Sequence, residues 1–559
     1  MSTQAELEDF ILWAEEMEAA EIEERCRRPW VRLWDGDWNY RGQVANENSG
    51  SWTWINNETG PGTLVLPIDE DDEDGTYLAY WALDEEARGT KNIHVTVDKS
   101  GARWGGRMKS ATLNRDPKGD NVTIEFLNDY EELKNVHCAP NPFLPLGIIQ
   151  QPKTVLWASQ VITGSKLLLL ANLGRLKLTD IAMGLGAALL APSYINSHTF
   201  TDWQIVVKPH TSDPSPFAFF TGKMKSWHDL CAPKFEDAEV TVVTRRWLTG
   251  DPPAWSGAPA LRNGTLVVDI VDKSGFRTGT SIGGDLMTGL ARSVANLASN
   301  NVEDEYDLIS TNPIVRDEYR VANWLGTIAP MPHVIYRDGY TTGIQSSNFT
   351  ITPPGPARIT AGGRSMPGVN EIISAAVNYA GDVLGDNISI AGYGIGSLGS
   401  AIDSFLNPIY TDSILAWTSV PLILRAIECG WGHYLETVAS GNSQAYTPST
   451  FGEIRKRRRE TDGDTTFTLS VLDALPFLIG DNGQGDWWVG DRIGATNKHL
   501  GTRVFVKRAQ ELTLSYSADQ PQQWKAELAD VRTPKDVLEK VTSLAQEIMG
   551  GLQEAGAMG

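Results

Sequence analysis

Between Trp30 and Asp129, apolar and polar residues alternate with a period of two, as in strands that bury one face. Turn signals rich in Gly, Asn and Pro interrupt the alternation at short intervals, among them Asp74-Gly75 and Lys99-Ser-Gly101. Short strands separated by such regular turns predict a barrel or sandwich. The strands expected from this pattern lie at residues 30–34, 38–40, 52–55, 63–66, 92–97 and 121–126.

The same alternation returns in the middle of the chain and near its C-terminal end. We therefore expect two β-domains, the first over 30–150 and completed by about 235–275, and the second over 446–532. The strand-like runs behind this expectation lie at residues 238–248, 264–272, 465–474 and 487–530.

Both ends of the chain show the 3.6-residue period of amphipathic helices. At 3–27 an apolar stripe repeats among acidic residues and stops before Pro29, so we expect 1–29 to be a helical arm that docks on a neighbour. The second helix, 533–559, starts well at Pro534. Its apolar residues fit either a short coiled-coil seam or packing on its own domain.

We expect mixed or helical structure in three segments outside the β-domains. The first is an inserted mixed α/β domain at 151–234, and the second is a mixed, largely extended region at 276–366. The third, 367–445, is apolar and rich in small residues, which predicts buried helices. A membrane-active role for it is disfavoured because four aspartates interrupt it, namely Asp382, Asp386, Asp403 and Asp412.

The composition is that of an ordinary globular protein with an unusual charge. Of 559 residues, 41% are apolar, and 19 are Trp, a residue suited to half-buried sheet faces and to subunit interfaces. At roughly 100–200 residues per domain, the length allows about three to five domains. The net charge of −22 repels nucleic acid and anionic membranes, although it also serves solubility alone.

The cysteines are too far apart to suggest a zinc site or a disulfide framework, and we expect lone buried thiols. They are Cys26, Cys138, Cys231 and Cys429. The acidic N-terminal segment lacks the apolar core of a signal peptide, and no run is long and apolar enough for a membrane span. We expect folding in a reducing cytoplasm and no membrane insertion.

Three short motifs could carry chemistry, and each has a simpler structural interpretation. Gly394–Gly399 matches GxGxxG, but the βαβ context of a dinucleotide site is missing. The acidic run Asp69–Asp74 favours a solvated hairpin loop over a calcium site. The basic block Arg455–Arg459 could grip phosphate, but an internal role in salt bridges is favoured.

The histidines give no signature of catalysis. The eight histidines show no metal-ligand spacing. His228, Asp229 and Cys231 could be imagined as a nucleophilic site, but adjacent residues rarely reach the required geometry. A glycosidase carboxylate pair stays open because it is defined by distance in space. We expect no enzyme, no catalytic residues, no cofactor and no metal.

Five longer stretches are distinctive as a set, namely Leu406–Trp417, Gly430–Glu436, Ala445–Ser449, Gly490–Ile493 and Leu64–Pro67. Together they resemble the tail-hub, or baseplate-hub, minor tail proteins of actinobacterial siphophages, the mycobacteriophage-like group. The likeness covers most of the chain and is sharpest over about 400–530.

The resemblance implies a β-rich α+β structural protein of the virion tail tip, assembled in the host cytoplasm. It implies a homotrimer in which each subunit supplies two tube-type β-domains, forming a pseudo-sixfold ring. The implied partners are the distal tail protein, the tape measure protein and other minor tail or fibre proteins. DNA would pass through the lumen without specific binding. Two alternatives stay open: a tail-associated cell-wall hydrolase, and a receptor-binding tip protein.

Overall fold

The computed structural model describes most of residues 2–273, 334–364 and 417–529. The structure does not describe residues 188–202, 274–318, 321–333, 365–388, 395–416, 445–453 and 530–559. Shorter gaps of one to six residues are also outside the described part. The expected C-terminal helix 533–559, most of the apolar segment 367–445 and most of the GxGxxG motif are among the residues outside it.

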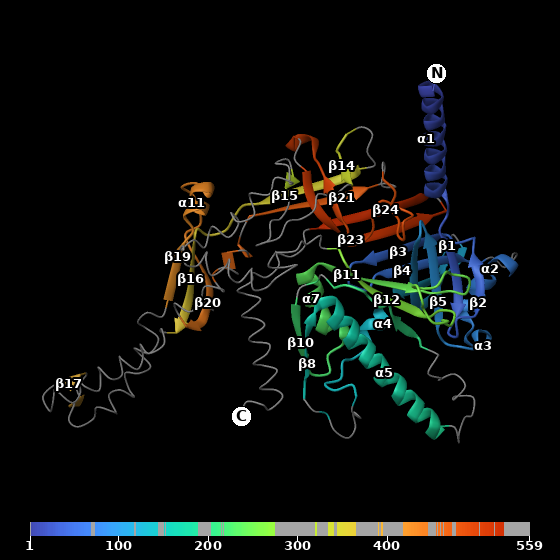
Figure 1. Ribbon diagram of the computed structural model, residues 1–559, viewed down its shortest axis with the longest axis horizontal. Coiled ribbons are helices and arrows are strands. Elements are labelled where there is room, and N and C mark those ends of the chain that lie inside the picture. The colour runs from blue at the N-terminus through green and yellow to red at the C-terminus, as the bar shows by residue number, and fades with distance from the viewer. Residues whose placement is uncertain are drawn as a thin grey trace.

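A twelve-stranded sheet forms the centre of the molecule (Figure 1). Its strands are β1 (Trp30–Asp35), β2 (Tyr40–Val44), β3 (Ser49–Ile55), β4 (Pro61–Pro67), β5 (Ile93–Lys99), β6 (Ala102–Asp116), β7 (Gly119–Asn128), β13 (Tyr319–Arg320), β14 (Ile335–Tyr336), β22 (Arg492–Ala495), β23 (Val504–Ser517) and β24 (Gln520–Ala529). The order is β14-β22-β23-β3-β4-β7-β6-β5-β1-β2, and β13 and β24 also pair with β23. The pairs are antiparallel except for β13–β23 and β14–β22.

Strands from the two ends of the chain lie side by side at the centre of this sheet. β3 pairs with β23, so that Trp52 lies opposite Leu514 and Thr53 opposite Thr513. Trp52 is fully buried and packs on Trp104 of β6, with 5.1 Å between the ring centroids. The segments 30–150 and 446–532 therefore share one sheet and one apolar core. The division into two β-domains stays a prediction.

A second unit packs beside this sheet around a core of its own. Its elements are α4 (Glu131–Lys134), β8 (Val155–Gln160), α5 (Val161–Ala187), β9 (Ile205–Val207), β10 (Phe217–Gly222), α7 (Trp227–Ala238), β11 (Val240–Arg246) and β12 (Leu266–Asp272). β11, β12 and β9 form one small sheet, and β10 and β8 form another. β11 and β12, which we expected to complete the first β-domain, are hydrogen bonded within this unit and share its core.

Smaller elements extend from the far end of the large sheet (Figure 1). β16 (Arg358–Arg364) lies between β19 (Trp417–Pro421) and β20 (Thr437–Gln444), beside the helix α11 (Ile423–Cys429). Their buried cluster is small and consists of Ile359, Ala361, Leu422 and Ile454. Two further pairs join β15 (Ile344–Thr352) to β21 (Asp464–Val471) and β17 (Ser389–Ile390) to β18 (Tyr393–Gly394).

Helices α1, α2 and α3 belong to the N-terminal region. The expected N-terminal helix is present as α1 (Ser2–Cys26), which stands away from the body in Figure 1. The expected turn at Asp74-Gly75 is wrong, because both residues lie in α2 (Glu73–Leu83), which the short α3 (Glu85–Arg88) follows. Ala79, Trp81 and Ala82 of α2 are buried against the large sheet, and this burial outweighs the local turn preference of Asp-Gly.

The other strand expectations are confirmed at the level of a β-rich fold, with three local corrections. Trp38 and Asn39 lie in the β1–β2 turn, and Trp487–Val489 make one isolated bridge in place of a strand. The fifteen-residue strand β6 was not expected. Cys138 and Cys231 are buried, but the free thiol Cys26 is exposed. Within the described residues, no helix is long and apolar enough to cross a membrane.

Candidate functional site: the seam and cleft between the two units

The large sheet and the second unit meet along a polar seam, which we define by the arginines Arg103, Arg246 and Arg508. Arg246 ends β11 and donates through Nε and Nη2 to Oδ1 of Asp129, at 2.9 and 2.8 Å. Asp129 follows β7, and both residues are buried. Burial raises the pKa of Asp129, and the Arg246 guanidinium opposes that rise. The guanidinium also lies over the ring of Trp38, 4.8 Å from its centroid.

Arg103 of β6 makes a second contact across the seam. It donates to Asp251 at 2.5 Å, to Asp98 at 2.6 Å and to the carbonyl of Arg246 at 2.8 Å. Burial lowers the pKa of Arg103, but the hydrogen bonds and charges of Asp251 and Asp98 together outweigh it and raise the pKa overall. Burial raises the pKa of Asp251, but the hydrogen bonds from Arg103 and the Leu248 amide, together with the nearby arginine charges, outweigh it and lower the pKa overall. Both partners are therefore held in their charged forms.

Arg508 of β23 ties the C-terminal strands to the same unit. It donates to the carbonyl of Glu239 at 3.1 Å and to the hydroxyl of Thr241 at 2.8 Å. Burial lowers its pKa to about 10. The buried carboxylate of Glu239 accepts from Arg492 at 2.6 Å. Three segments distant in sequence, β6–β7, β11 and β22–β23, are thus joined by buried charges, which are costly unless paired and hydrogen bonded.

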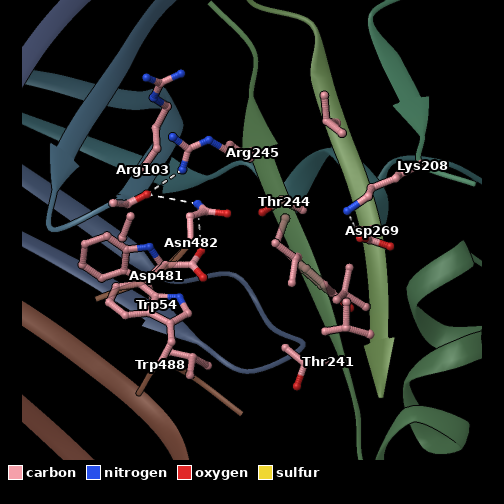
Figure 2. Close-up of a pocket in the computed structure, with 18 of the residues that line it drawn as sticks. Trp54, Arg103, Lys208, Thr241, Thr244, Arg245, Asp269, Asp481, Asn482 and Trp488 are labelled. Carbon is pink, nitrogen blue, oxygen red and sulfur yellow. Dashed lines mark hydrogen bonds and ion pairs between the residues drawn. The ribbon is translucent and has the colours of Figure 1, made fainter. Parts of the chain in front are cut away.

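A cleft of about 790 Å³ opens along this seam between the two units (Figure 2). The β5–β6 turn lines the cleft, and there the carbonyl of Gly101 accepts from Arg245 at 2.8 Å and from Asn482 at 3.1 Å. Ser100 and Gly101 both have positive φ, 45° and 74°, as a two-residue type I′ hairpin turn requires. A side chain at 101 would collide with the carbonyl of Asp481, 2.1 Å from the ideal Cβ position.

Trp54 and Trp488 lie on one side of the cleft, below Arg103, and the charged pair Lys208 and Asp269 lies on the other side (Figure 2). Trp54 lies 5.2 Å from Trp488 and 5.4 Å from Trp524 between ring centroids, and the first two rings line the cleft. Opposite them, Asp269 of β12 pairs with Lys208 at 2.9 Å and with Lys166 at 2.7 Å. Half-buried Trp rings facing polar groups suit the binding of another molecule or the packing of another chain.

Two acids of this cleft, Asp251 and Asp269, are poorly suited to acid–base catalysis. A glycosidase needs one carboxylic acid whose pKa is raised towards neutrality. Asp251, which lines the cleft, has a lowered pKa, and Asp269 is paired with two lysines. Among the described residues, no group of three or more His, Cys, Asp or Glu is arranged to hold a metal ion. The arrangement therefore supports binding or packing.

The other residues singled out in the sequence have contacts or burial that favour structural roles, where the structure describes them. His228 Nδ1 lies 2.9 Å from the hydroxyl of Tyr130, and complete burial raises the pKa of the Cys231 thiol well above its usual range. A thiolate nucleophile is disfavoured there. Of Arg455–Arg459, Arg457 pairs with Glu460 at 3.1 Å and Arg458 is buried. Asp69–Asp72 and residues 395–400 are outside the described part.

Sequence reasoning missed the seam arginines. A signal was available: Arg246 follows the strand-like run Val240–Thr244, and Arg508 continues the run Val504–Val506. A cation that continues the alternation of a buried strand must be paired, because a lone buried charge is very unfavourable. Its carboxylate partners come from distant segments, so the pairs themselves were not predictable.

Comparison with known proteins identifies relatives along nearly the whole chain. Residues 30–528 match the sequence model of the family described as Siphovirus ReqiPepy6 Gp37-like protein. The chain is 31% identical over 588 aligned positions to minor tail protein Gp28 of Mycobacterium phage L5, covering 96% of each chain. Minor tail protein Gp28 of Mycobacterium phage D29 matches with the same identity and coverage.

Solved structures with a distant likeness include two bacterial tail proteins. The tail protein from Neisseria meningitidis MC58 is 11% identical with a TM-score of 0.36, and the match covers 91% of this chain and 99% of that one. The prophage MuSo2 43 kDa tail protein from Shewanella oneidensis is 9% identical with a TM-score of 0.37 and the same coverage.

Proposed function

Since the chain belongs to the Siphovirus ReqiPepy6 Gp37-like family and is a minor tail protein of a phage tail, we propose that it is the hub of the tail tip. In this proposal three copies close the distal end of the tail tube. They connect the distal tail protein, the tape measure protein and the tip or fibre proteins. The hub then serves host attachment and the passage of DNA.

The observation that carries this proposal is the single sheet built from both ends of the chain. β3 and β23 pair directly, and the seam arginines fasten the second unit to both halves of that sheet. Buried ion pairs contribute little net stability, but they fix one geometry and are costly to break. Such a body suits a component that must keep its shape while neighbours attach on several sides.

Exposed aromatic residues near one edge of the sheet support self-association. Strand β2 is the terminal strand of the sheet order, so its outer edge has no strand partner within the described sheet. Trp30, Tyr40, Tyr77 and Tyr80, on β1, β2 and α2, are 47%, 54%, 51% and 41% exposed. Aromatic residues are enriched at subunit interfaces, and a free strand edge can pair with a second chain. We assign the contact between copies to this edge.

The net charge of −22 fits a protein past which DNA slides. Binding to DNA depends on Lys and Arg that neutralise phosphates, and an acidic wall offers no such neutralisation. In the proposed ring, DNA therefore passes the lumen without specific binding.

Light scattering on the purified full chain, with a map of the tail tip of intact particles, tests the hub. We expect a particle of three chain masses in solution and three copies around the tail axis. Replacing Trp30 and Tyr40 by Ser should shift the purified chain towards monomer. The same change at Tyr434, which is 75% exposed on the distant α11–β20 connection, should not. A single copy at the tip, or a position away from the tip, would refute the hub.

The two alternatives have separate tests. A cell-wall hydrolase would clear a peptidoglycan zymogram, and the paired carboxylates of the cleft lead us to expect no clearing. A receptor-binding protein would adsorb to host cells as the isolated chain. The Trp54–Trp488 wall of the cleft is the observation that favours this second function, because sugar rings stack on Trp faces. Trp488→Ala would then abolish adsorption without changing the trimer.

A further inference from the structure

The helix α1 combines a long exposed surface with a fixed direction. It has 25 residues, which at 1.5 Å per residue corresponds to about 37 Å. Figure 1 shows that α1 joins the body at its C-terminal end and that its N-terminal end points away from the body. Its large apolar side chains are exposed to solvent, namely Phe10 60%, Ile11 46%, Leu12 57%, Trp13 55%, Met17 51% and Ile22 52%.

Four of these residues, Phe10 to Trp13, are consecutive, and we call them the apolar band. Successive residues of a helix are about 100° apart, so four in a row cover most of its circumference. A helix that lies on a flat surface or in a shallow groove buries one stripe and needs polar residues opposite. A band that surrounds the helix is buried only when its partner surrounds it too.

The base of α1 is fixed to the large sheet by an unusual arrangement. Lys99, 2% exposed at the end of β5, donates from Nζ to the carbonyls of Glu24, Arg25 and Arg27, the last two at 3.2 and 2.5 Å. A buried ammonium at the negative end of a helix is a favourable C-terminal cap. Ser100 donates from N and Oγ to the Glu24 carboxylate at 3.1 and 3.0 Å.

The C-terminal strands also hold this base. Gln522 of β24 donates from Nε2 to the carbonyl of Arg25. The helix is therefore tied both to the β5–β6 hairpin and to β24. A helix that pointed in random directions would not need such fixation, so the base sets the direction in which the apolar band is presented.

Charge selects the kind of partner. Residues Ser2–Cys26 contain nine Asp or Glu and one Arg. A bundle of several copies of α1 would bring these like charges together, which is unfavourable. An anionic membrane would repel the helix for the same reason. A protein surface with Lys or Arg around an apolar socket satisfies both the band and the acids.

We propose that α1 is a docking helix for a different tail protein. That protein has an apolar socket that encloses Phe10–Trp13, and Lys or Arg on the socket rim face the glutamates that follow the band. The inference rests on the chain being a tail protein, and it adds to the hub proposal a defined point of attachment that the contact between copies does not use.

Photo-crosslinking in intact phage particles tests the occupant. A benzophenone amino acid replaces Leu12 in the full chain, and a control chain carries it at Leu113 of β6, which is 53% exposed. We expect an adduct of one copy of this chain with one different tail protein. The crosslinked peptide should be apolar with Lys or Arg nearby. An adduct between two copies of this chain, or a yield no higher than at Leu113, would overturn the proposal.

Substitutions separate the two parts of the recognition. Phe10→Ser with Trp13→Ser removes the band, and Glu15→Lys with Glu16→Lys reverses charge beside it. All four side chains are exposed, so the purified chains should keep their fold and oligomeric state. When either double variant complements a phage that lacks the gene, the yield of infectious particles should be at least tenfold lower than with the wild-type chain. Tyr434→Ser with Leu113→Ser, at 75% and 53% exposure and outside the edge assigned to the contact between copies, should affect it less than twofold.

The outcomes distinguish this inference from the hub. If three copies ring the tail tip while both α1 variants assemble normally, the docking helix is wrong and the hub stands. If the α1 variants fail and the crosslink reaches a different tail protein at another place in the tail, the docking helix stands and the hub is wrong.

Discussion

Removing the guanidinium of Arg246 tests whether the polar seam joins the two units. In Arg246→Met the side chain keeps a similar length and packing, but the buried carboxylate of Asp129 loses both hydrogen bonds, at 2.9 and 2.8 Å. The carbonyl of Gly264 also loses its donor, at 2.9 Å. The change therefore leaves an unpaired charge and an unpaired carbonyl between the cores.

The expected cost follows from the burial of the pair. Breaking a buried ion pair by removing one partner costs about 3–5 kcal/mol, because the remaining charge has no compensation. Arg246→Met combined with Asp129→Asn removes that charge too, so the double variant should regain about 1–2 kcal/mol of the loss. A control is Arg107→Met, whose 47% exposed side chain pairs with Glu132 at 2.6 Å. A solvent-exposed pair of this kind contributes less than about 1 kcal/mol.

The loss should also depend on pH with a defined sign. Burial raises the pKa of Asp129 above that of an unfolded aspartate, and Arg246 opposes the rise. In the Arg246→Met variant, Asp129 binds a proton more readily in the folded state than in the unfolded state. The variant is therefore most destabilised at pH values above the raised pKa of Asp129, where this carboxyl is charged. The loss shrinks as the pH falls through that pKa. The difference from the wild type should thus be smaller at pH 5 than at pH 8.

Hydrogen–deuterium exchange of the β11 amides measures this free energy locally, which suits a chain whose units can open separately. The reasoning is refuted if Arg246→Met costs less than 1 kcal/mol at pH 8, or if the double variant is no more stable than the single one.

Three further predictions concern single buried side chains. Burial lowers the pKa of His94 to about 3, so the folded state keeps this imidazole neutral while the unfolded state gains a proton below about pH 6.5. The free energy of unfolding should therefore fall on acidification, by about 2 kcal/mol at pH 5. His94→Phe should flatten the urea stability profile between pH 7 and 5. Lys99→Met removes the cap of α1, and amide exchange in the last turn of α1 should rise at least tenfold while β7 is unchanged. Trp52→Ala opens a cavity against Trp104 and should cost about 3–5 kcal/mol by calorimetric unfolding, and a loss below 1 kcal/mol would contradict the shared core.

Local patterns predicted the elements well where burial follows the strand period. The run Trp30–Trp34 became β1, and the Lys99-Ser-Gly101 signal became a hairpin turn, because alternation and turn chemistry act within a few residues. The same reasoning failed at Asp74-Gly75, where helix α2 forms because its apolar residues are buried against a distant sheet. The candidate site was predicted least well, since the Trp54–Trp488 wall and the Arg246–Asp129 pair join residues far apart in the chain.

The sequence by itself determined that this protein is β-rich, acidic and similar to tail proteins, because strand alternation, net charge and sequence likeness are all properties of order along the chain. The tertiary structure alone decided that β3 pairs with β23, that three buried arginines fasten the second unit to the sheet, and that Lys99 fixes the base of α1. Pairing energies depend on distances in space between groups up to hundreds of residues apart, and no local pattern contains those distances.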